Sequence, residues 1–215
     1  MILLSLSRRT GERRSGMTLV ECMAALAMLA VVGASLMLAT QASVESSNQA
    51  LDETLARGIA AQYLDEALGL PFADPQATAG DPNNVLSDPL GTKVSGGPRS
   101  VWSDLDDFAG AQDGDHRTPR VESPLVDPWG HPLGTGGSSA VVDRHPGFAL
   151  PADYFAGWQV ETNVFYVADA SSFAPQDAPT YYRMLEVQVF RSRPDGSRMI
   201  LAELRRAVIH VPKSN

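Results

Sequence analysis

Glu21 has the most unusual surroundings in this chain, because it is a carboxylate near the start of an otherwise apolar stretch. No charged residue lies between Glu21 and Glu45. An ionisable side chain at membrane depth costs about 3 kcal/mol or more unless it is paired, and such a residue is by default a functional candidate. The first question raised by the sequence is therefore which cation Glu21 pairs with.

A second group of carboxylates lies in the segment "SDLDDF", which contains Asp104, Asp106 and Asp107. Hard oxygen ligands at such short spacing suit calcium, but the segment lacks the D-x-D-x-D-G loop pattern and its turn glycine. We therefore expect a solvated acidic loop held in place by Trp102 and Phe108. Calcium binding is the alternative, and no other cofactor is expected.

The histidines do not form a pattern of metal ligands. They contain no i, i+4 pair and no H-E-x-x-H arrangement, so we assign none of them to a metal: His116, His131, His145 and His210. The chain also lacks a G-x-S-x-G elbow and a glycine-rich phosphate loop set between a strand and a helix, so no enzyme class has positive support. The segment "DPWGHP", residues 127–132, predicts a turn with a packed tryptophan.

Composition limits the classes of protein that this chain can represent. Its 215 residues are 44% hydrophobic, which suits one globular domain on one membrane helix. Acidic residues outnumber basic ones by 25 to 17, and no basic face is visible outside the N-terminus, so nucleic acid is not expected as a partner. The single cysteine, Cys22, excludes an internal disulfide.

The apolar stretch is long enough to cross a membrane. It contains 23 uncharged positions from Cys22 to Val44, and a spanning helix needs about 20. Four arginines precede it and acidic residues follow it, which places the N-terminus in the cytoplasm and everything after Thr40 outside the membrane. Two alternatives remain open, a plain membrane anchor and a signal peptide cleaved after Ala42.

The segment "SGMTLVECMAALAML" resembles the processing site of type IV prepilins and type II secretion pseudopilins. The resemblance implies that a prepilin peptidase cuts after Gly16 and methylates the new N-terminal amine of Met17. Family members usually have phenylalanine where Met17 stands. Glu21 occupies the family's characteristic glutamate position, so the resemblance implies an assembly role in which its carboxylate pairs with the amine of Met17 in an adjacent subunit. The alternative is a carboxylate that snorkels to the cytoplasmic interface.

The helix is expected to continue beyond the membrane. Apolar residues recur at helical spacing between 41 and 69, at Val44, Leu51, Leu55, Ile59, Tyr63 or Leu64, and Leu68. Gly69 followed by Pro71 provides the stop signal. The sequence from Thr18 to Leu70 looks like the minor pseudopilin I group and the related minor pilin V group. Their shared pattern is matched here by Asn48, Leu51, Thr54, Ala56, Ala60, Leu64 and Glu66.

The last third of the chain predicts antiparallel strands. The segment "GWQVETNVFYVAD" places one face at Trp158, Val160, Thr162, Val164 and Tyr166. The next strand alternates Leu185, Val187 and Val189 with Glu186, Gln188 and Phe190. A "RPDGS" turn over 193–197 then leads into a return strand, and the helix over 51–68 is the available cover for the apolar face of this meander.

These elements predict an α+β fold, in which a long N-terminal helix packs on a small antiparallel sheet of about three to four strands. This is also the architecture of the pilins and pseudopilins. The expected organisation is a leader over 1–16, a transmembrane and filament-core helix over 17–40, an amphipathic continuation over 41–70, a Pro/Gly/Asp-rich loop region over 71–157 and antiparallel strands over 158–215.

The function implied by the resemblance is structural: a minor pseudopilin of a type II secretion pseudopilus. Its expected partners are other pseudopilins or pilins, the prepilin peptidase, the inner-membrane assembly platform and membrane lipid. The expected location is the bacterial inner membrane, with a single pass, a periplasmic C-terminal domain and later extraction into a periplasmic filament. Two alternatives are a minor type IV pilin, serving adhesion, motility or DNA uptake, and a membrane-tethered periplasmic binding module that uses residues 71–157.

Overall fold

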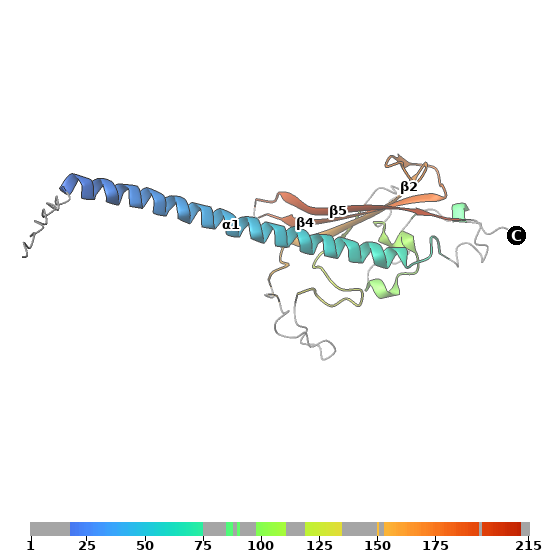
Figure 1. Ribbon diagram of the computed structural model, residues 1–215. Coiled ribbons are helices and arrows are strands. Elements are labelled where there is room, and N and C mark those ends of the chain that lie inside the picture. The colour runs from blue at the N-terminus through green and yellow to red at the C-terminus, as the bar shows by residue number, and fades with distance from the viewer. Residues whose placement is uncertain are drawn as a thin grey trace, which may run out of the picture. The chain divides into compact units, whose positions relative to one another are not determined.

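The computed structural model describes residues 18–74, 85–87, 90, 98–110, 119–134, 150, 153–193 and 195–211. These residues form one long α-helix, three short 3-10 helices and five β-strands (Figure 1). The contacts divide the chain into two compact units, one ending at Gln49 and the other beginning at Ala50. The long helix therefore contributes its first part to one unit and its last part to the other.

Helix α1 runs without interruption over Leu19–Leu68, a total of 50 residues. At 1.5 Å per residue it is about 75 Å long. It ends at Leu68, as the sequence predicted. The backbone N–H of Gly69 closes the helix by donating to the carbonyls of Asp65 and Glu66, each at 3.2 Å. The prediction that the helix continues beyond the apolar stretch to residue 68 is confirmed.

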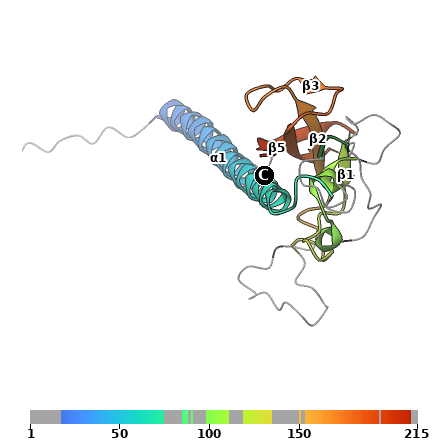
Figure 2. The ribbon, with the colours of Figure 1, turned by 90° about the vertical axis from the view of Figure 1, so that its right-hand side faces the viewer.

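The sheet is antiparallel throughout. Its strands are β1 (Arg120–Glu122), β2 (Trp158–Val167), β3 (Pro175–Gln176), β4 (Tyr182–Ser192) and β5 (Arg198–Ile209). The order is β1-β2-β4-β5, and β3 pairs with β2 beyond the end of β1 (Figure 2). The three long strands are the predicted meander, and β1 and β3 are short additions that the sequence pattern did not predict. The result is an α+β arrangement consistent with the pilin-like fold.

The predicted inward face of β2 is confirmed, since all five of its alternating residues are buried: Trp158, Val160, Thr162, Val164 and Tyr166. In β4 the alternation also holds for Leu185, Val187 and Val189. Phe190 is buried as well, at a register shift between β4 and β5, with the guanidinium of Arg198 lying 4.5 Å from its ring centre. The turn after β4 is present, and Gly196 adopts a positive φ of 81° there.

The face that α1 buries differs from the predicted one. Leu51 and Leu68 are 49% and 43% exposed, whereas the buried helix residues are Ala56, Ile59, Ala60, Tyr63, Leu64 and Ala67. Half of this face is alanine. Small side chains let a helix backbone approach its neighbour closely, and the large residues of the sheet then fill the space. Of the predicted face, Ile59 is buried, and so are both of the alternatives Tyr63 and Leu64, whereas the three alanines were not predicted.

The region predicted as loop contains short ordered elements among its described residues. These are three 3-10 helices, η1 (Val85–Ser87), η2 (Arg99–Val101) and η3 (Leu105–Phe108), together with strand β1. The hydroxyl of Thr162 on β2 donates to the carbonyl of Phe108 at 2.6 Å, and the rings of Trp102 and Phe108 meet edge to face at 4.6 Å. The expectation that Trp102 and Phe108 hold this segment in place is confirmed, since both are buried.

Candidate functional site

The carboxylate of Glu21 lies in the first turn of α1, where it caps its own helix. Its Oε2 accepts a hydrogen bond from the backbone N–H of Thr18 at 2.8 Å and from the Thr18 hydroxyl at 3.1 Å. In return, the backbone N–H of Glu21 donates to the Thr18 hydroxyl at 3.3 Å. The described hydrogen bonds of this carboxylate both use Oε2. Gly16 and Met17, the predicted processing residues, lie outside the described residues.

This reciprocal arrangement is a capping box, in which two orphan N–H groups at a helix start are satisfied by side chains. Its sequence signal is a threonine followed three residues later by a glutamate, a spacing that is visible without a structure. The structure thus adds a second partner for Glu21, within its own chain. A proposed pairing of this carboxylate with another subunit therefore has to be distinguished from its capping interaction with Thr18.

The surface of α1 beyond this cap is apolar and exposed. Many of its large apolar side chains are exposed, among them Leu19, Val20, Met23, Leu26, Met28, Leu29, Val31, Val32, Leu36, Met37 and Leu38. Its most apolar window has a mean hydropathy of 2.3. Among the described residues, α1 is the one helix long and apolar enough to cross a membrane. A continuous apolar surface of this size needs lipid or protein around it.

The acidic group in the middle of the chain is not a solvated loop, so that prediction was wrong. Asp104, Asp106 and Asp107 are all fully buried. Asp104 caps η3 by accepting from the backbone N–H of Asp106 at 3.0 Å, and Asp107 accepts from the backbone N–H of Ser103 at 2.8 Å. The aspartates are therefore part of the internal framework of this segment.

Asp106 forms a fully buried ion pair with Arg183 of β4, at 2.5 Å. The same guanidinium nitrogen donates to the carbonyl of Phe72. The guanidinium also lies 4.1 Å from the ring centre of Phe72 and 5.5 Å from that of Tyr166. Arg183 thus joins the segment after α1, helix η3 and the sheet. Arg183 was not predicted to be buried, because the local sequence around a charged strand residue gives no signal of its burial.

Calcium is not expected to bind the acidic group, because all three carboxylates are buried and each has one oxygen engaged by a backbone N–H or by Arg183. Among the described residues, no cluster of three or more His, Cys, Asp or Glu side chains has a geometry suited to a metal ion. We expect calcium to leave the melting temperature of a soluble fragment from residue 50 onward unchanged, and calorimetry to detect no binding. A calcium-dependent rise in melting temperature would contradict this expectation.

A second buried arginine, Arg99, connects the end of α1 to β1. Its guanidinium donates to Glu66 at 2.7 Å, to Glu122 at 2.6 Å and to the Tyr63 hydroxyl at 2.7 Å. It also donates to the carbonyl of Val126 at 3.0 Å. Burial, followed by the negative charge of Glu122, raises the pKa of Tyr63 well above its usual value, so this hydroxyl stays protonated. Two carboxylates around one buried cation fix the position of the middle segment on the helix.

The turn at residues 127–132 is present, but its tryptophan is not packed as predicted. Trp129 is 67% exposed. The Asp127 carboxylate accepts from the backbone N–H groups of Trp129 and His131, at 3.0 and 2.8 Å, and contacts Nδ1 of His131 at 3.0 Å. Gly130 has a φ of +89°, which a side chain would strain. The turn is therefore rigid and presents its largest apolar group to the outside.

Among the described residues, neither His210 nor Cys22 belongs to a group of side chains that could hold a metal ion. The ring of His210 contacts those of Phe72 and Tyr181, at centroid distances of 5.4 and 6.0 Å. Cys22 is an exposed free thiol on α1. His116 and His145 fall outside the described residues.

Comparison of the chain with protein-family models, with curated proteins and with solved structures finds no match. The fold and the site thus define the protein by architecture: one long apolar N-terminal helix that could span a membrane and whose C-terminal part packs on a small antiparallel sheet.

Proposed function

We propose that this protein is a structural subunit of a type II secretion pseudopilus, similar to the minor pseudopilins. One observation carries the proposal: a single carboxylate, Glu21, lies at the start of an exposed apolar stretch that has no further charge before Glu45. The helix that contains this stretch continues without a break into a folded unit. A plain anchor has no use for a carboxylate at this depth. In an assembly of such helices, each carboxylate is a counter-charge for the amine of a neighbouring chain.

The proposed pathway follows from this arrangement. The chain enters the inner membrane with its arginine-rich N-terminus in the cytoplasm and the unit from Ala50 onward in the periplasm. The prepilin peptidase removes residues 1–16, and the mature chain is extracted from the lipid by the assembly platform to join other pseudopilins. In the lipid, Glu21 is held by Thr18. In the filament, its carboxylate is shared with the amine of Met17 from the next subunit.

The alternatives keep the same helix and differ in what the folded unit does. A minor type IV pilin uses the same processing and assembly steps, so the helix alone does not separate it from a pseudopilin. A membrane-tethered binding module would use residues 71–157 to hold a ligand. The described part of that segment is occupied internally by the contacts of Arg99, Asp106 and Arg183, which favours a structural role.

The processing step provides the first test. The mature protein is expected to begin at N-methylated Met17, and Gly16→Glu is expected to leave the precursor uncut because a side chain there obstructs the peptidase. Gly33→Ala is a suitable control, since a Cβ at Gly33 meets nothing within 4 Å. N-terminal mass spectrometry of the membrane fraction makes the measurement. A wild-type chain that keeps residues 1–16, or one that begins at Ser43, would show the proposed function to be wrong.

A further inference from the structure

Strand β5 has an open edge that runs along the whole strand (Figure 2). Its 12 residues pair with β4 on one side, and among the described residues no strand pairs with the other side. An open edge carries a row of N–H and C=O groups, which can bind an extended segment through main-chain hydrogen bonds. The edge of β5 is therefore a candidate interaction surface, and its side chains decide what kind of segment it binds.

The middle of β5 places one arginine in an otherwise apolar row. Leu204 and Val208 are partly buried and pack against the main hydrophobic core. Arg206 lies between them on the same face, opposite the fully buried Leu185 of β4, yet Arg206 is exposed. Its guanidinium therefore reaches past the edge of the sheet instead of entering the core. A strand added at this edge would place its own core-facing side chains beside these three residues of β5.

Arg206 is also the charged residue of β5 that has no ion pair or hydrogen bond in the described part of the chain. The other charges of the strand are compensated: Arg205 lies 2.6 Å from Glu186 and 2.8 Å from Glu203, and Arg198 has a carboxylate partner at 3.2 Å. An uncompensated cation beside an apolar row favours a segment that brings a carboxylate to the same place. A second copy of β5 would instead bring another uncompensated arginine, so the charge favours a different chain.

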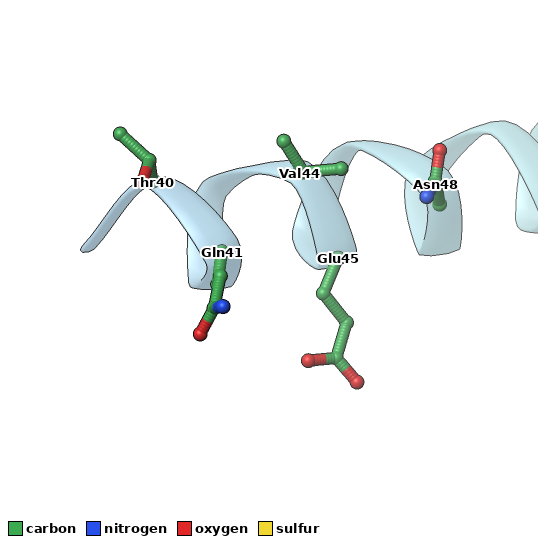
Figure 3. Close-up of a pocket in the computed structure, with 5 residues that line it drawn as sticks. All are labelled: Thr40, Gln41, Val44, Glu45 and Asn48. Carbon is green, nitrogen blue, oxygen red and sulfur yellow. The ribbon is translucent and has the colours of Figure 1, made fainter. Parts of the chain in front are cut away.

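The hollow on α1 offers no comparable pattern. It is lined by Thr40, Gln41, Val44, Glu45 and Asn48, and Figure 3 shows these side chains on successive turns of one helix. A groove between rows of side chains is a general property of a helix surface, and here four of the five lining residues are polar. We therefore assign no partner to the hollow.

We propose that the open edge of β5 binds an extended acidic segment of another protein as an added strand. Main-chain hydrogen bonds hold the segment, two of its apolar side chains extend the row of Leu204 and Val208, and a carboxylate between them pairs with Arg206. The recognised segment thus has an apolar, an acidic and an apolar residue at alternate positions. This contact goes beyond the proposed function and does not depend on it, because it uses only the folded unit.

A synthetic peptide tests the contact on the full chain in detergent. The probe carries valine, glutamate and valine at alternate positions of one face and threonine on the other. It is expected to bind and to slow amide hydrogen exchange in β5, because N–H groups at the open edge become bonded. The same peptide with methylated backbone nitrogens along its pairing edge cannot donate these bonds and should not bind. Absence of binding by the probe, or equal binding by the methylated peptide, would overturn the proposal.

Charge reversal tests the role of Arg206. Arg206→Glu should weaken binding of the glutamate probe at least about fivefold, because an opposite-charge pair across two strands becomes a like-charge pair. A probe with lysine in place of glutamate should bind this variant better than it binds the wild-type chain. Arg57→Glu is the matched control, since it changes the net charge equally at an exposed arginine of α1, and it should leave binding unchanged.

Two further results would contradict the proposal. If Arg206→Glu and Arg57→Glu weaken binding equally, the peptide responds to net charge and not to the edge of β5. If the probe slows hydrogen exchange in other strands but not in residues 198–209, it binds elsewhere on the chain.

Discussion

Replacing Glu21 with glutamine is expected to abolish filament assembly while membrane insertion and removal of the leader continue. Glutamine also forms a capping box, so Glu21→Gln keeps the hydrogen bonds to Thr18 and removes only the charge. If the carboxylate pairs with the amine of Met17 from a neighbour, its loss leaves that amine uncompensated. Breaking one side of a buried ion pair costs about 3–5 kcal/mol, which is enough to exclude a subunit from a filament.

The matched variant is Thr18→Val, which removes the capping hydroxyl and keeps the charge. Loss of an N-cap costs about 1 kcal/mol, so this chain should still assemble. Glu21→Leu should fail as Glu21→Gln does, and Glu21→Asp should be intermediate because its reach is shorter. The measurement is crosslinking to the other filament subunits, scored together with secretion or piliation. If Thr18→Val fails and Glu21→Gln assembles, the cap is the essential feature and the inter-subunit pair is wrong.

Replacing Arg183 with leucine is expected to destabilise the folded unit by about 3–5 kcal/mol, because Asp106 is then left as a buried charge without its partner. For a domain of this size such a loss lowers the melting temperature by about 10 °C. The unit from Ala50 onward has its own hydrophobic core, so a fragment of residues 50–215 is suitable for the measurement. Thermal unfolding followed by circular dichroism gives the shift.

Two comparisons make this result specific to the ion pair. The double variant Asp106→Leu/Arg183→Leu removes both charges and should recover part of the stability, because a buried pair can be replaced by apolar side chains at little cost. Arg206→Leu, at an exposed arginine of the neighbouring strand, should change the melting temperature by only a few degrees. A loss of less than about 1 kcal/mol for Arg183→Leu would show that the pair does not hold the segment.

The elements with strong periodicity were predictable from the sequence. The alternation in β2 and β4 identified their buried faces, and Gly69 with Pro71 identified the end of α1. The helix face was predictable only in part. Alanine occurs on exposed helix faces as well as on buried ones, so Ala56, Ala60 and Ala67 gave no signal of burial. Strands β1 and β3 are too short to show a pattern, and they exist because β2 offers them a partner.

The candidate site was predictable to a smaller extent, because burial of charge is decided by distant parts of the chain. Arg99 meets Glu66 and Glu122 only after the middle segment folds back on the helix, and Asp106 meets Arg183 across 77 positions of sequence. A single sequence gives no signal for such pairs. The capping box of Thr18 and Glu21 is different, since both residues lie within four positions and their pattern could be identified without a structure.

The strand order leaves β5 at one edge of the sheet, and this edge has a consequence for solubility. Within the described residues, β5 pairs only with β4, so a 12-residue strand presents one row of backbone donors and acceptors. Such an edge is a template for unwanted pairing with other chains. Four exposed charged residues are distributed along it, at Arg198, Glu203, Arg205 and Arg206. They disfavour pairing of identical edges, so the folded unit is protected from aggregation at β5.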